Sequence, residues 1–110
     1  MKCYIYAADT YCEKCGESIR SKLHKHGEAP ANPDDEHYDS GVYPKGPFDV
    51  EASDTPEHCG SGSDCLEPTV IAGRPYGLFL ENPLTRDGEA YVKDADDGSV
   101  ADFWKAHYGL

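Results

Sequence analysis

The sequence predicts a small α+β domain. Three observations support this prediction: an N-terminal segment typical of a β-strand, amphipathic segments near both ends that are typical of helices, and two short cysteine clusters. The chain has 110 residues, which corresponds to a single domain over residues 1–110. Its hydrophobic fraction of 38% predicts a modest core, and small cores often depend on a metal ion or on disulfides.

The two cysteine clusters lie far apart in the sequence. Cys12 and Cys15 form a C-x2-C pair that is followed by Gly16, and Cys59 and Cys65 form a second pair separated by five residues. A C-x2-C pair places two thiolates on one tight turn, and glycine at the next position tolerates a positive φ. Structural zinc sites need four ligands in a tetrahedron. We therefore expect these four cysteines to bind one Zn²⁺ ion, which closes the 43 intervening residues into a loop.

Other interpretations of the cysteines remain open. A disulfide framework is one, although the number of cysteines is odd and we expect no secretory segment. A redox-active C-x2-C pair would need a thioredoxin-like βαβ context, and the cysteines could also be unrelated buried thiols. His58 is the alternate ligand to Cys59, ranked second because neighbouring side chains seldom point at one ion. Cys3 alternates with tyrosines and is expected to be a core thiol of a strand.

Four thiolates would complete the coordination of the zinc ion. Catalytic zinc keeps an open position for water or substrate, so we expect a structural ion. Structural zinc contributes about 10–16 kcal/mol in finger peptides, and a whole domain is stable by only about 5–15 kcal/mol. The metal would then decide whether this chain folds.

The charge of the chain is strongly negative and uneven. The net charge is −11, with +2 over residues 1–27, −10 over residues 28–67 and −3 over residues 68–110. This charge disfavours binding to nucleic-acid phosphates, and it favours solubility or a basic protein partner. No apolar run is long enough for a membrane span, so we expect no membrane association and a reducing, cytoplasmic location.

The first quarter of the chain predicts a strand followed by a helix. Residues 2–7 are rich in aromatic and β-branched side chains, and a helical pattern runs over residues 16–26 until Gly27 ends it. A cysteine turn that runs directly into a helix resembles zinc-ribbon and treble-clef modules. The basic residues of this helix form a candidate binding surface for phosphate or acidic groups, namely Arg20, Lys22 and Lys25, with His24 and His26 beside them.

Residues 28–57 form an acidic stretch that contains five of the eight prolines. It shows no helical or strand period, so we expect a long irregular loop. The apolar and aromatic residues of its second half are expected to hold the loop against the domain: Tyr38, Val42, Tyr43, Phe48 and Val50.

The last third predicts two short strands and two helices. The strands are expected over residues 69–71 and 78–80, in one small sheet with residues 2–7. The helices are expected over residues 86–95, with Thr85 as N-cap, and 100–108, with a capping box of Ser99 and Asp102. Trp104 is at helical spacing with apolar neighbours and is expected in the core.

Three segments resemble short hypothetical proteins of bacteria and their phages. They are residues 11–16 (YCEKCG), 58–65 (HCGSGSDC) and 80–85 (LENPLT), together with Gly88 and Tyr91-Val92. The resemblance covers most of the chain. It implies a bacterial or bacteriophage origin and a cytoplasmic location, and it assigns no catalytic residue.

These features favour a non-enzymatic zinc module that acts by binding a macromolecule, with a protein as the expected partner. The alternatives are mimicry of nucleic acid by the acidic segment and nucleic-acid binding through the basic helix. A metal-dependent nuclease or hydrolase is a further alternative, with Glu57-His58 and Glu36-His37 as its nearest candidates.

Overall fold

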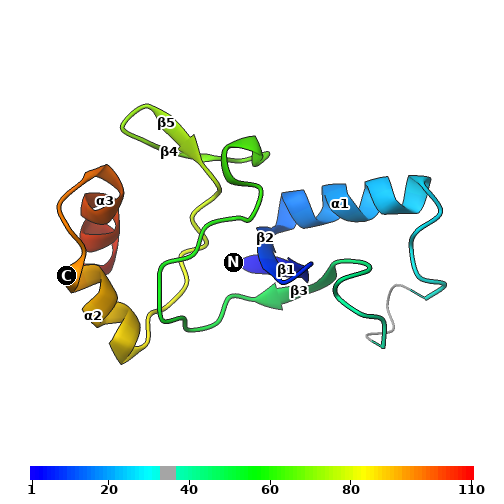
Figure 1. Ribbon diagram of the computed structural model, residues 1–110, viewed down its shortest axis with the longest axis horizontal. Coiled ribbons are helices and arrows are strands. Elements are labelled where there is room, and N and C mark those ends of the chain that lie inside the picture. The colour runs from blue at the N-terminus through cyan, green and yellow to red at the C-terminus, as the bar shows by residue number, and fades with distance from the viewer. Residues whose placement is uncertain (33–36) are drawn as a thin grey trace.

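The computed structural model describes residues 1–32 and 37–110. The predicted α+β class is confirmed, because the described chain contains three α-helices and two small antiparallel sheets. The molecule is elongated, with extents of 47 × 30 × 18 Å. Figure 1 shows a sheet and one helix at one end, two helices at the other end, and a central segment with a projecting hairpin.

The N-terminal sheet has three antiparallel strands in the order β2-β1-β3. The predicted N-terminal strand is confirmed as β1 (Lys2–Tyr6). A two-residue turn with positive φ at Ala7 and Ala8 leads into β2 (Asp9–Cys12), which suits the right-handed twist of a hairpin.

The third strand corrects the prediction of an irregular loop over residues 28–57. Residues of β3 (Lys45–Asp49) pair with β1, and the register shifts between Cys3 and Ile5. Pro47 argues against a strand when the sequence is read alone, but proline is tolerated in a strand at the edge of a sheet, which is the position of β3. Glu36 of the nuclease candidate Glu36-His37 lies outside the described residues.

Helix α1 (Glu13–Lys25) begins three residues earlier than predicted. Gly16 is therefore helical, and the expectation of a positive φ at this glycine is wrong. Glycine is needed for a different reason, because a Cβ atom at this position would collide with the ring of Tyr4 on β1. The predicted stop is confirmed, since Gly27 follows the helix with φ of 72°.

Arg20 holds α1 against the segment that leads into β3. Its guanidinium lies 4.8 Å from the ring centroid of Tyr4 and 5.1 Å from that of Tyr43. It donates hydrogen bonds to the carbonyl oxygens of Pro44 and Gly46. Tyr43 is buried and holds this segment to the domain as predicted, whereas Val42 is 56% exposed and does not.

The central hairpin consists of β4 (Thr69–Ile71) and β5 (Arg74–Tyr76). It is a separate sheet, so the prediction of one sheet with residues 2–7 is wrong. The predicted strand at residues 78–80 is also wrong, because only Phe79 pairs there, in an isolated bridge with His58.

The C-terminal pair is α2 (Arg86–Asp94) and α3 (Ser99–Tyr108), close to the predicted bounds. Thr85 is the N-cap of α2 as predicted, and its Oγ1 accepts a hydrogen bond from the Gly88 amide at 3.1 Å. The capping box at Ser99 is wrong, because Gly98 is the N-cap residue of α3 and no side chain caps that helix. No helix of the described chain is long and apolar enough to cross a membrane.

Asn82 joins the C-terminal helices to the central segment. It is fully buried, its Oδ1 accepts from the Glu57 amide at 3.0 Å, and its Nδ2 donates to the Thr55 carbonyl at 3.1 Å. The Tyr108 hydroxyl of α3 donates to the Asn82 carbonyl at 2.7 Å. Since buried polar groups need such partners, these bonds determine how the two parts meet.

The Gly16→Ala variant tests the packing of α1 on β1. Alanine favours an isolated helix by about 1 kcal/mol over glycine. The methyl group must displace the Tyr4 ring, and such overpacking costs roughly 1–3 kcal/mol. We expect a net loss of stability in urea denaturation. Ser21→Ala, at an exposed position of the same helix, is the control. Unchanged or increased stability of Gly16→Ala would contradict the close packing of Gly16 on Tyr4.

Candidate metal centre

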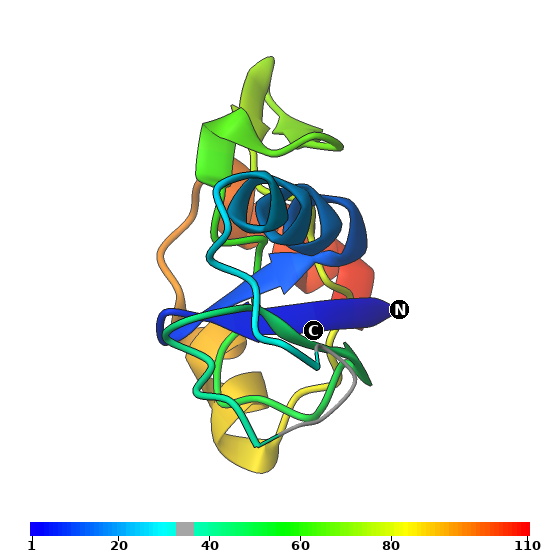
Figure 2. The same cartoon turned by 90° about the vertical axis from the view of Figure 1, so that its right-hand side faces the viewer.

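The two cysteine pairs meet at the junction between the N-terminal sheet and the central segment. Cys12 ends β2 and Cys15 lies in the first turn of α1. Cys59 follows the bridge between His58 and Phe79, and Cys65 follows a short 3₁₀ helix (Gly62–Asp64). Figure 2 views the molecule along the axis of α1.

Backbone hydrogen bonds hold the second cysteine pair in place. The Cys59 amide donates to the Leu78 carbonyl at 2.9 Å, and the Gly60 amide donates to the Thr10 carbonyl of β2 at 2.7 Å. The Cys65 amide donates to the Gly62 carbonyl at 3.1 Å, which curls the five-residue spacer into one turn. The spacer therefore brings both sulfurs toward the start of α1.

The four sulfur atoms have the spacing of a tetrahedral metal site. All four lie within 4.8 Å of one another. The Sγ of Cys65 is 3.7 Å from that of Cys12 and 3.6 Å from that of Cys15. Zinc–sulfur bonds of about 2.3 Å give a tetrahedron with edges of about 3.8 Å. The cluster therefore fits a zinc-binding site, and it could hold a metal ion.

The cluster is closed to solvent. The four cysteines are between 1% and 6% exposed, and the fully buried side chain of Leu80 packs against them. Since a catalytic metal must keep a position open to water or substrate, this enclosure is the arrangement of a structural site.

Hydrogen bonds to sulfur stabilise negative charge in the cluster. The Leu66 amide donates to the Cys15 sulfur at 3.4 Å, and the Leu78 amide donates to the Cys65 sulfur at 3.5 Å. Burial alone would raise the pKa of Cys15, but hydrogen bonds from the Ser61 hydroxyl and the Leu66 amide lower it to about 7. Such outer contacts are typical partners of metal ligands.

Two other thiols of the cluster have a pKa that is raised, in contrast to the lowered pKa of Cys15. Burial is the main cause that raises the pKa of Cys12 well above the ordinary value, and it also raises the pKa of Cys59. A thiol that burial keeps protonated becomes a thiolate when a cation replaces its proton. A cation could therefore take the place of these protons in the cluster.

His58, the alternate ligand, lies outside the sulfur cluster. Its Nδ1 is 2.8 Å from the Gly77 carbonyl oxygen, and its Nε2 accepts from the Trp104 indole at 3.4 Å. Both ring nitrogens are thus engaged away from the sulfurs. The ring packs between Tyr76, Phe79 and Trp104, so it connects the cysteine turn to α3.

Cys3 and the basic residues of α1 also lie apart from the cluster. Cys3 is a buried thiol of β1, as expected, and its pKa is raised by burial and then by the charges of Glu57 and Glu51. Lys22 and Lys25 are exposed. Arg20 is not part of an exposed basic face, because its guanidinium is used against Tyr4, Tyr43 and the Pro44 carbonyl.

The contact between His58 and Trp104 was missed by sequence reasoning. The only signal was the pairing of a histidine beside the cysteine turn with an indole on an amphipathic helix 46 residues later. The sequence alone gives no reason to place these two side chains in contact, because they are 46 residues apart.

The variants His58→Ala and Cys59→Ala separate the two candidate ligands. We expect His58→Ala to take up Zn²⁺ with the same stoichiometry, while losing roughly 1–3 kcal/mol of stability through its aromatic and hydrogen-bonded contacts. We expect Cys59→Ala to lose tight uptake. Native mass spectrometry after refolding with Zn²⁺ measures both. Loss of the ion in His58→Ala would make the histidine a ligand.

Comparison with protein-family models, with curated proteins and with solved structures found no match for this chain. The sulfur cluster and the surfaces around it are therefore the observations from which a function can be argued.

Proposed function

We propose that this protein is a non-enzymatic zinc module that acts by binding another protein. The observation that supports the metal is the convergence of four buried thiols from two remote segments. In this proposal Cys12, Cys15, Cys59 and Cys65 hold Zn²⁺, and the ion stabilises a surface rather than a reaction.

The ligand set favours zinc over the hard divalent cations. Ca²⁺ and Mg²⁺ take oxygen ligands, whereas a tetrahedral set of four thiolates suits zinc or iron. Zinc has no redox chemistry and gives the closed four-coordinate sites of structural modules. Elemental analysis of protein purified without added metal distinguishes zinc from iron.

Two exposed apolar side chains beside the cluster support a role in protein binding. Leu66, directly after Cys65, is 59% exposed, and Val70, on the projecting hairpin, is 63% exposed (Figure 1). Exposed apolar side chains are common singly. Here both belong to the short segment whose position the metal would hold, so they are rigidly presented, and rigid apolar contacts favour binding.

The surface of α1 supports nucleic-acid binding less well. Arg20 makes contacts within the protein, which leaves Lys22 and Lys25 as the exposed cations among the three predicted residues. The net charge of −11 repels a phosphate backbone. A protein partner with a basic surface agrees with the same charge.

Removal of the metal tests the first part of the proposal. We expect one zinc ion per chain, and we expect a chelator with a reductant to abolish the dispersed NMR signals of α1 and of residues 59–65. The reason is that structural zinc contributes about 10–16 kcal/mol, more than a small domain can lose. Re-addition of Zn²⁺ should restore the signals, and Mg²⁺ should not.

Cys12→Ala and Cys3→Ala form the matched pair for this test. Both remove a buried thiol of the N-terminal sheet, but only Cys12 belongs to the cluster. Retained zinc in Cys12→Ala, or a chelated protein that keeps its native spectrum, would contradict the proposed structural role of the ion.

A photo-crosslinking amino acid at position 70 tests the second part. We expect it to give one discrete crosslinked protein in cells, and the same group at Lys93, an exposed position of α2, to give none. Val70→Asp should weaken association with the captured protein by at least tenfold, and Val42→Asp, also at an exposed valine, should not. Equal capture from both positions would contradict the hairpin surface.

A further inference from the structure

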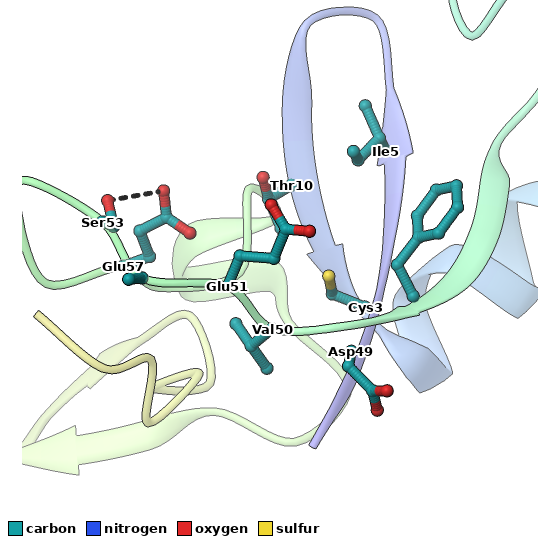
Figure 3. A pocket seen from close by; sticks show the side chains of 10 residues that line it. Cys3, Ile5, Thr10, Asp49, Val50, Glu51, Ser53 and Glu57 are labelled. Atoms are coloured by element: carbon teal, nitrogen blue, oxygen red, sulfur yellow. Dashed lines mark hydrogen bonds between the residues drawn. The ribbon is translucent and has the colours of Figure 1, made fainter.

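A pocket of about 380 Å³ lies on the N-terminal sheet. Cys3, Ile5 and Thr10 share this face, because side chains alternate along a strand and Ile5 is paired with Thr10 across β1 and β2. Tyr4 points to the other face, where α1 packs. The chain after β3 forms the second wall, as Figure 3 shows. The volume is in the range of small-ligand sites.

The pocket combines an apolar floor with unbalanced negative charge. Ile5, Phe48 and Val50 contribute apolar surface, and the carboxylates of Glu51 and Glu57 contribute charge. The described residues that line the pocket include no lysine, arginine or histidine. The remaining acidic residue, Asp49, pairs with Lys2 at 2.8 Å, so its charge is balanced.

The thiol of Cys3 is a polar group without a partner in this pocket. Cys3 is 5% exposed, and within residues 1–32 and 37–110 its sulfur makes no hydrogen bond. In Figure 3 the sulfur lies on the side of β1 where the Glu51 carboxylate lies. A soft thiol beside apolar groups is a good surface for an alkyl chain.

Hydrogen bonds within the protein hold the pocket wall that contains Ser53 and Glu57 in place. The Glu57 amide donates to Asn82 Oδ1 and its carbonyl accepts from the Leu80 amide, both at 3.0 Å. The Ser53 hydroxyl donates to Glu57 Oε1 at 3.2 Å. The Ser53 backbone is bonded on both sides as well, to Pro83 and to Thr85 at 3.0 Å. A site that is ordered before binding loses less entropy when a ligand enters.

We propose that this pocket binds a primary ammonium group on an unbranched alkyl stem, as found in a lysine side chain or an aliphatic diamine. The stem would lie on Ile5 and Phe48, and the ammonium would meet the carboxylates of Glu51 and Glu57. A metal ion fits less well, because among the described residues only the four clustered cysteines have the spacing of a metal site. The proposal goes beyond the proposed zinc function, although Val50 of the pocket lining also packs against the sulfur cluster.

Titration with 1,5-diaminopentane and with capped lysine tests this proposal on the zinc-loaded full chain. We expect amide NMR shifts at Cys3, Thr10 and Glu51, and weaker binding when salt rises from about 50 to 500 mM. The uncharged probe 1-pentanol should bind at least tenfold more weakly. Binding of the diamine alone would identify a small-molecule site, and binding of capped lysine would identify a site for a protein side chain.

The double variant Glu51→Gln/Glu57→Gln should lose roughly tenfold in affinity, since two ion pairs are removed while the hydrogen bond from Ser53 can remain. Glu28→Gln/Glu89→Gln is the matched control, because it changes the net charge equally at exposed positions outside the pocket. Equal weakening in both double variants, equal affinity for 1-pentanol, or no shift at the pocket would overturn the proposal. Glu51→Gln alone, at an exposed position, keeps the test valid if the double variant folds poorly.

Discussion

The structure depends on the meeting of four thiols from two segments that are remote in the sequence. Cys12 and Cys15 belong to the junction of β2 and α1, and Cys59 and Cys65 belong to a turn that 43 residues separate from Cys15. Closing a loop of this length costs on the order of 3 kcal/mol in chain entropy, before the constant for initiation. A cation that four thiolates share can offset this cost.

The cysteine turn also transmits order to the C-terminal helices. His58 precedes Cys59 and packs against Trp104 of α3. The amide of Glu57, the residue before His58, donates a hydrogen bond to the Asn82 side chain. The Asn82 carbonyl in turn accepts a hydrogen bond from the Tyr108 hydroxyl of α3. Whatever fixes the cysteine turn therefore fixes the position of α3. At the opposite end of the molecule, Arg20 joins two elements in a similar way, because its contacts with Tyr43 and the Pro44 carbonyl hold α1 to the segment before β3. These contacts lie along a molecule whose longest extent is 47 Å.

Local rules were enough for the parts of the chain whose partners lie nearby in sequence. The β1 strand, the end of α1 at Gly27, the Thr85 cap and the last two helices all follow from periodicity and capping chemistry. Where a cap depends on exact backbone geometry the rule failed, since Gly98 took the position expected for Ser99. The errors at β3 and at residues 78–80 concern strands, whose pairing partners are remote and whose propensities depend on context.

The sequence by itself determined the composition of the candidate metal site, because cysteine chemistry restricts what two such pairs can do together. It also determined the acidic charge and the class of the fold. Only the tertiary structure decided that His58 faces Trp104 rather than the sulfurs, that Arg20 is turned inward onto two tyrosines, and that Cys3 opens into an acidic pocket. The reason is that side-chain direction is set by which elements pack together, and no local pattern contains that information.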